Sequence, residues 1–156
     1  MSASDVVDAC ACPVLRSLER ARLQGGLVLE PVSDRERDLV ARQAALHEEN
    51  ALRDLAQGGR VVVHIPAHPP ERAATSMERA MAAGADVIYQ GVLLSPPWLG
   101  RPDFLRKVPG ESRFGPFRYE VLDAKLARHA RSQALVQGAV YSLILDRVQG
   151  VAPEHL

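Results

Sequence analysis

The chain has 156 residues, of which 47% are hydrophobic and 24% charged, and its formal net charge at pH 7 is zero. This length and composition predict one globular domain with a hydrophobic core, while the neutral charge balance excludes an overall basic field that would drive non-specific nucleic-acid binding. The sequence shows neither a signal-peptide pattern nor an apolar run of about 18 residues, so we expect a cytoplasmic protein outside the membrane.

A first helix is expected near the N-terminus, where Ser2 or Ser4 can cap it and the two glycines after Gln24 end it. The only cysteines, Cys10 and Cys12, are separated by one residue, which is a poor spacing for a mutual disulfide. Two thiols are also too few to close a metal site. Taken alone, both cysteines are predicted to be structural thiols.

A second helix is indicated by a capping box between Ser33 and Glu36, and its pattern continues to the glycines at 58–59. Its apolar positions recur at offsets of three and four residues, which is the period of one helical face. His47 falls on this apolar stripe, so we expect its side chain to face inward. The stripe consists of Val40, Ala44, His47, Ala51 and Leu55.

The middle of the chain is predicted to form strands. A short buried strand at residues 60–65 precedes a Pro-rich loop and a short helix at residues 71–83. Three further strands are expected at residues 85–94, 98–108 and 117–127, separated by turn sequences rich in Pro and Gly. Successive strands with short connections predict an antiparallel meander.

The last expected element is a helix at residues 129–148, which carries Gln137 and Tyr141 on one stripe because they are four residues apart. Helices on either side of the strand region predict an α/β fold. We expect a small mixed sheet with an antiparallel meander, flanked by helices.

Asp123 and Lys125 place an acid and an amine where a buried strand is usually apolar. The chain has only two lysines, so a lysine two residues after an aspartate stands out. In a strand these two side chains point to the same face, about 6.6 Å apart along the backbone. A hairpin would bring Asp103, on the preceding predicted strand, close to Asp123. Pro102 cannot donate a ladder hydrogen bond, which predicts an edge or a bulge at that point.

Two converging carboxylates near a lysine predict a cation site, because hard divalent ions prefer carboxylate oxygens. His47 can add a nitrogen ligand from its helix. A divalent ion lowers the pKa of its bound water and stabilises charge on a leaving oxygen, while Lys125 can hold or polarise the attacking water. These groups together predict hydrolysis of phosphodiesters.

The order of these motifs resembles that of the RecB-like nucleases of the PD-(D/E)xK superfamily, which are often fused to helicase domains. The resemblance covers about residues 33–150. The matching motifs are His-Glu at 47–48, Gly-Ala-Asp-Val-Ile-Tyr-Gln at 84–90, Gly-x-x-Asp at 100–103, Asp-Ala-Lys-Leu-Ala-Arg at 123–128 and Gln-x-x-x-Tyr at 137–141. Each motif alone is common, and it is their joint occurrence in this order that carries the resemblance.

The resemblance implies one domain over residues 1–156 with a restriction-endonuclease-like core and metal-dependent cleavage of DNA in repair or recombination. The implied ligands of Mg²⁺ or Mn²⁺ are His47, Asp103, Asp123 and the Ala124 carbonyl. The implied catalytic residues are Asp103, Asp123 and Lys125, while Gln137 and Tyr141 would line the site and contact DNA or position the lysine. The implied partners are DNA and a helicase domain or subunit.

Two arginines adjoin these motifs in the sequence. Arg101 and Arg128 can contact phosphates, although arginines on a solvated face without such a role are more frequent. A different class of function also stays open, in which the chain is a non-catalytic module with the nuclease fold that binds nucleic acid or protein.

Many relatives end in a cysteine triplet that joins an N-terminal cysteine around an iron–sulfur cluster, and Cys12 resembles that N-terminal ligand. A cluster needs about four thiolates, so none is expected here. The chain is therefore interpreted as lacking the C-terminal part of the family domain, and Cys12 would be a cluster ligand only in a longer chain.

Overall fold

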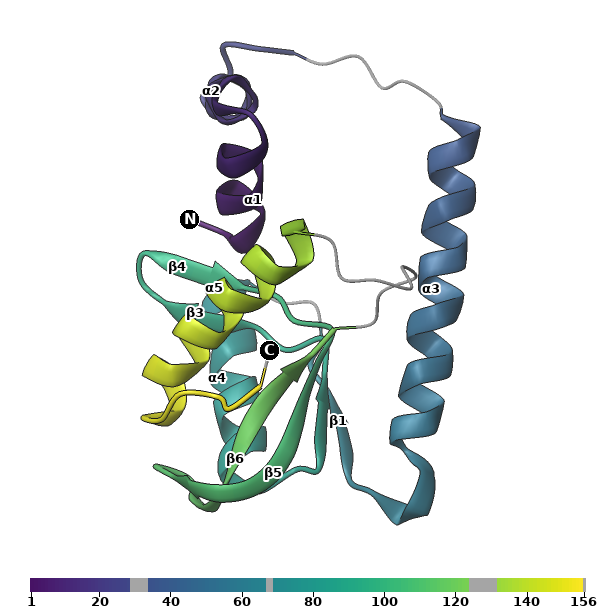
Figure 1. The fold of residues 1–156 in the computed structure, drawn as a ribbon, viewed down its shortest axis with the longest axis vertical. Helices are drawn as coiled ribbons and strands as arrows, with labels where there is room; N and C mark the ends of the chain where they lie inside the picture. Colours follow the sequence, from purple (N-terminus) through teal and green to yellow (C-terminus); the bar gives the residue numbers. More distant parts are fainter. Residues whose placement is uncertain (29–33, 67–68, 124–131, 156) are drawn as a thin grey trace.

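The structure, a computed structural model, describes residues 1–28, 34–66, 69–123 and 132–155. Its described part is a mixed α/β fold with one sheet of strand order β1-β2-β5-β6 and a separate β3–β4 pair, surrounded by helices (Figure 1). The expected α/β class is confirmed. Within the described ranges, no helix has the length and apolar character needed to cross a membrane.

The main sheet combines parallel and antiparallel pairs. β1 (Val62–His64) runs parallel to β2 (Val87–Tyr89), and β2 runs antiparallel to β5 (Phe104–Ser112). β5 pairs antiparallel with β6 (Gly115–Leu122). The register aligns one residue from each strand across the sheet, namely His64, Tyr89, Phe104 and Leu122. These four residues therefore mark one end of the sheet. Gln90, Asp103 and Asp123 are the residues that adjoin Tyr89, Phe104 and Leu122 at this end.

Two of the expected strands are each divided in the structure. Residues 85–94 form β2 and then β3 (Leu93–Ser95), because Gln90 adopts a φ of +53° and turns the chain between them. Residues 98–108 form β4 (Trp98–Gly100) and the beginning of β5. β3 and β4 pair with each other across the cis Pro96–Pro97 bond. The antiparallel meander is thus β2–β5–β6, with a separate hairpin inserted after β2.

The β5–β6 hairpin is longer at its turn and shorter at its open end than predicted. Residues 109–116, expected as a loop, mostly continue the two strands, and a register shift near Pro109 accommodates the missing N–H. At the other end β6 stops at Leu122, since its partner β5 begins only at Phe104, two residues after Pro102. The rest of the predicted strand, residues 124–127, lies outside the described residues.

The single N-terminal helix that we expected is two helices. α1 (Ala3–Ala11) and α2 (Pro13–Leu23) are separated at Cys12, whose φ and ψ are −160° and 116°. Pro13 causes this break, because a proline disfavours helical geometry in the residue before it. The predicted cap is confirmed for Ser2, whose hydroxyl accepts from the backbone N–H of Asp5 at 3.1 Å.

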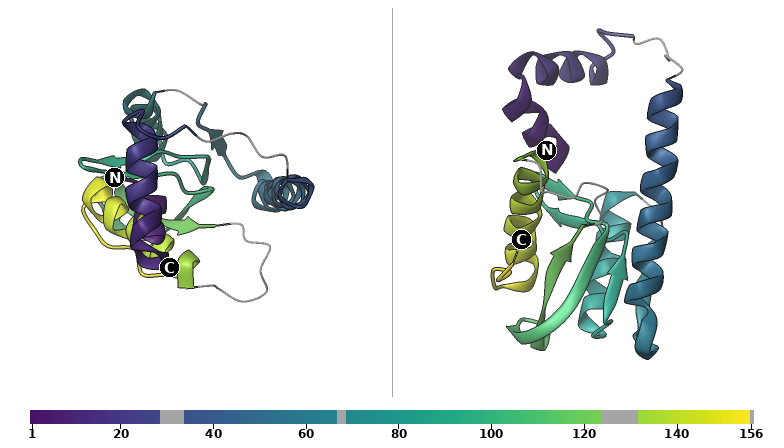
Figure 2. Two further views of the ribbon diagram at one scale, coloured as in Figure 1. Left: turned by 90° about the horizontal axis from the view of Figure 1, so that it is seen from above. Right: turned by 45° about the vertical axis from the view of Figure 1, so that its right-hand side comes forward.

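α3 (Arg35–Leu55) stands to one side of the molecule, away from the C-terminal helix (Figures 1 and 2). The prediction that its apolar stripe faces inward was wrong for Val40, Ala44 and His47, which are exposed. Only the C-terminal end of the stripe, including Leu55, is half-buried, because the described contacts of α3 with the sheet edge lie in that half. The capping residue predicted for α3 lies outside the described residues.

The core lies between the sheet and the helices α4 (Pro70–Ala82) and α5 (Ser132–Gln149), which match the predicted helices within the described residues. The buried cluster combines both helices with the sheet, through Met77, Met81, Ile88, Leu105, Tyr119, Ile144 and Leu145. Gln149 is fully buried, and its side-chain amide makes two hydrogen bonds with the backbone of Tyr119. Its Oε1 accepts from the Tyr119 N–H at 2.8 Å, and its Nε2 donates to the Tyr119 carbonyl at 3.1 Å. This pairing fixes the end of α5 to β6.

Candidate functional site

The β5–β6 hairpin places Asp103 and Asp123 at the same edge of the sheet. Phe104, the first residue of β5, pairs with Leu122, the last residue of β6. Asp103 and Asp123 are the next positions outward on these two neighbouring strands, and both are half-buried. The structure thus brings together the two carboxylate positions that the sequence singled out.

A cavity of about 320 Å³ opens beside Asp103. Its polar groups come from separate segments, with Glu48 from α3, Gln90 from the end of β2, and Arg101 and Asp103 from the β4–β5 connection. The apolar part of the wall consists of Ile65, Pro66, Val92 and Pro102. Two carboxylates, a guanidinium and an amide therefore share one partly apolar cavity.

Gln90 connects the walls of this cavity. Its side-chain amide donates to Glu48 Oε1 at 3.3 Å and to the Tyr89 hydroxyl at 3.0 Å, and its Oε1 lies 3.2 Å from His64 Nε2. Its backbone N–H donates to the carbonyl of Asp103 at 2.8 Å. A non-glycine residue with positive φ is uncommon. In this conformation Gln90 contacts Glu48 of α3, His64 of β1 and the backbone of Asp103 in the β4–β5 connection.

Tyr89 lies at the base of this network between two other rings. Its ring centroid is 5.0 Å from that of His64 and 5.3 Å from that of Phe104. Burial raises the pKa of the Tyr89 hydroxyl, as do its hydrogen bond with Glu48 and the negative charge of Asp103. A tyrosine is protonated near neutral pH even at its ordinary pKa, so the hydroxyl can donate its hydrogen bond to the Glu48 carboxylate.

Helix α3 presents Glu48 to the cavity, whereas His47 is exposed. Adjacent residues of an α-helix point about 100° apart, so the two cannot face the cavity together. The expectation that His47 faces inward is therefore corrected. The sequence favours His47 because this residue lies on the apolar stripe of the helix. The residue that lines the cavity is the adjacent Glu48, which the His-Glu motif also contains.

The predicted pair on α5, Gln137 and Tyr141, is hydrogen bonded to the backbone segment that precedes Asp103. Tyr141 is only 4% exposed, and its hydroxyl accepts from Gln137 Nε2 at 2.7 Å and donates to the carbonyl of Arg101 at 3.0 Å. Its ring packs directly against Gly100. Gln137 and Tyr141 are therefore bonded to each other and to the segment that leads to Asp103.

Some of the predicted residues cannot be placed in the site. Ala124, Lys125 and Arg128 lie outside the described residues. Cys12 lies between α1 and α2 with a free, half-buried thiol.

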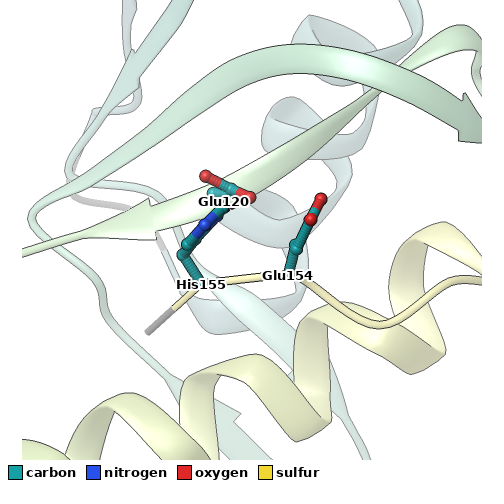
Figure 3. Close-up of side chains that lie close together, drawn as sticks. All are labelled: Glu120, Glu154 and His155. Atoms are coloured by element: carbon teal, nitrogen blue, oxygen red, sulfur yellow. Dashed lines mark hydrogen bonds and ion pairs between the residues drawn. The ribbon is translucent and has the colours of Figure 1, made fainter.

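A second group of potential metal ligands lies elsewhere, where Glu154 and His155 of the C-terminal segment approach Glu120 of β6 (Figure 3). One ligand atom from each residue lies within 4.8 Å of the others. The Glu120 carboxylate is buried, with His155 Nδ1 at 3.0 Å and Arg106 at 3.6 Å, and Glu154 pairs with Arg118. Arginines therefore already balance both carboxylates, and this cluster attaches the C-terminal segment to the sheet.

Comparisons of the chain with protein-family models, with curated proteins and with solved structures gave no match.

Proposed function

We propose that this chain is a divalent-metal-dependent nuclease of the RecB-like kind that hydrolyses DNA phosphodiester bonds. The observation that supports this most strongly is the β5–β6 register, in which Asp103 and Asp123 directly adjoin the last paired residues, Phe104 and Leu122, at one end of the sheet. The Glu48 carboxylate lines the cavity together with Asp103. Oxygen ligands converging from separate elements are what Mg²⁺ and Mn²⁺ bind in proteins.

In this proposal Asp103, Asp123 and the Ala124 carbonyl hold the ion, together with a residue of α3. The resemblance assigns that last role to His47, whereas Glu48 is the α3 residue that lines the cavity. When bound, the ion would supply an activated water and stabilise charge on the leaving oxygen.

The other polar groups act on the substrate and on the attacking water. Arg101, exposed at the cavity, offers a guanidinium that can grip a phosphate through two parallel hydrogen bonds. Lys125 would hold or polarise the water, as the Asp-x-Lys motif implies.

The proposed partner is DNA, with a helicase domain or subunit that exposes strands for cleavage in repair or recombination. The chain has zero net charge and so lacks an overall basic surface for binding the DNA phosphates. In this proposal the helicase partner supplies that basic surface, and this chain cleaves the DNA.

The direct test is a DNA cleavage assay with Mg²⁺ or Mn²⁺ on the wild type, Asp103→Asn, Asp123→Asn and Asp38→Asn. The first two variants remove a charge from the proposed site and are expected to lose activity by at least about 100-fold. Asp38 is an exposed residue of α3, so its variant should cleave like the wild type. Unchanged cleavage by Asp123→Asn would refute the proposal, and DNA binding that persists in chelator without any cleavage would favour a non-catalytic binding module.

A further inference from the structure

We propose that Tyr141 is a positioning residue of this site, which sets the place of Asp103 through the backbone of Arg101. In this role its side chain contacts neither the ion nor DNA. The inference deepens the proposed nuclease function and rests on it.

The first support is the bonding of the Tyr141 hydroxyl. It donates to the Arg101 carbonyl at 3.0 Å and accepts from Gln137 Nε2 at 2.7 Å. A hydroxyl that is buried with both a donor and an acceptor in place has one preferred orientation. Tyr141 thus joins α5 to a backbone carbonyl two residues before Asp103.

The second support is the fit of the Tyr141 ring against Gly100. A Cβ at Gly100 would lie 2.8 Å from Cδ1 of this ring and 3.2 Å from Cδ1 of Ile144. Real Cβ atoms do not approach other atoms at the shorter of these distances, so the backbone can lie this close to α5 only because the residue is glycine. The last residue of β4, immediately before the β4–β5 connection, therefore packs directly against the tyrosine ring.

The third support is that only one residue separates Arg101, whose carbonyl Tyr141 holds, from Asp103. Between Arg101 and Asp103 lies Pro102, which is buried and has a φ fixed by its ring. On its other side, Asp103 is held by the hydrogen bond from Gln90 to its carbonyl and by the β5 ladder that begins at Phe104. Tyr141 therefore supplies the restraint on the N-terminal side of this carboxylate.

Such a restraint matters because ligand atoms of a metal site must lie within about 0.5 Å of their working positions. Without the hydroxyl, the Arg101 carbonyl loses the hydrogen bond that holds it to α5, and the β4–β5 connection gains freedom to move. The same movement would shift Asp103 away from the ion, so the first quantity to change should be metal affinity.

The test compares Tyr141→Phe with Ser142→Ala, two variants that each remove one buried hydroxyl from neighbouring positions of α5. The Ser142 hydroxyl is buried and has no hydrogen-bond partner among the described residues. Ser142→Ala therefore removes one buried hydroxyl, as Tyr141→Phe does, but breaks no hydrogen bond to Arg101. Mn²⁺ affinity is measured by calorimetry and DNA cleavage by steady-state kinetics, both well below the melting temperature of each variant.

We expect Tyr141→Phe to bind Mn²⁺ about tenfold more weakly, as is usual when a group that orients a metal ligand is lost, and to recover cleavage when Mn²⁺ is raised. Ser142→Ala should match the wild type within about twofold. Gly100→Ala, which pushes the same segment off the ring, should also weaken Mn²⁺ binding.

Each other outcome overturns the inference in a recognisable way. Wild-type Mn²⁺ affinity in Tyr141→Phe would overturn it and leave the nuclease proposal standing. A raised KM for DNA at unchanged Mn²⁺ affinity would make Tyr141 a DNA contact instead, and equal losses in Tyr141→Phe and Ser142→Ala would show general loosening of α5. A wild type that neither binds Mn²⁺ nor cleaves DNA would overturn the proposed function and this inference together.

Discussion

The side-chain amide of Gln90 donates to the Glu48 carboxylate at 3.3 Å, which joins the end of β2 to the middle of α3 across 42 positions of the chain. Because Glu48 is also hydrogen bonded to Tyr89, its carboxylate is oriented at the cavity by Tyr89, the last residue of β2, and by Gln90, which follows it. Helix α3 therefore contributes an oriented acid to the candidate site, in addition to any role of its exposed histidine.

Glu48→Gln and His47→Gln form a matched pair for testing which of these two residues serves the site. If the proposed ion binds in the cavity, Mn²⁺ should raise the melting temperature of the wild type by mass action. We expect this rise to shrink strongly in Glu48→Gln and to persist in His47→Gln, because only Glu48 lines the cavity. A thermal-shift titration measures both, and the reverse order of effects would give the ligand role to His47.

Replacement of Gln90 should separate stability from activity. A glycine at this position adopts the observed φ of +53° without the cost of roughly 1 kcal/mol that a side chain incurs. Gln90→Gly also removes the hydrogen bonds to Glu48 and Tyr89, so we expect near-normal stability together with a large loss of cleavage. Denaturant unfolding and the nuclease assay check the two halves, and full activity in this variant would exclude a role for the Gln90 side chain.

Gln149→Leu should destabilise the fold severely. The amide of Gln149 satisfies both the N–H and the carbonyl of Tyr119 inside the core, and leucine leaves both unpaired. Each buried unpaired group costs about 1–3 kcal/mol, so a loss on the order of 3 kcal/mol in the free energy of unfolding is expected. Urea titration measures it, with Gln133→Leu at an exposed position of α5 as the control; equal stability of the two variants would contradict the assigned role.

The Asp86–Lys107 pair predicts a loss of stability in acid. The Lys107 ammonium lies 2.5 Å from the Asp86 carboxylate, which also accepts from the Val61 N–H at 2.8 Å, and these bonds lower the pKa of Asp86 in the folded state. A carboxyl with a lowered folded pKa stabilises the protein above its unfolded pKa of about 3.8, and that stability disappears as the pH falls through the folded value. Melting temperatures from pH 6 down to pH 2 should therefore fall less steeply for Asp86→Asn than for the wild type, and parallel curves would exclude the linkage.

Several elements follow from local sequence because their causes are local. The Ser2 cap needs only Asp5 three residues later, and the turn at Gly84 needs only a residue that tolerates its φ of +72°. The break at Cys12 also has a local cause in Pro13, which the prediction of a single N-terminal helix did not take into account. The division at Gln90 has no such cue, because positive φ at a glutamine is maintained by bonds to distant segments.

The sequence by itself determined the α/β class, the helices of the core and the hairpin that brings the Asp103 and Asp123 positions together, since strand alternation and turn residues act between near neighbours. Tertiary structure alone decided that Glu48 faces the cavity and that Tyr141 holds the Arg101 carbonyl. A hydrophobic stripe predicts which helix face is apolar, but the direction that a polar side chain takes depends on which distant segment packs beside it. Glu48 with Gln90 and Tyr141 with Arg101 are joined across 42 and 40 positions, beyond the reach of any local pattern.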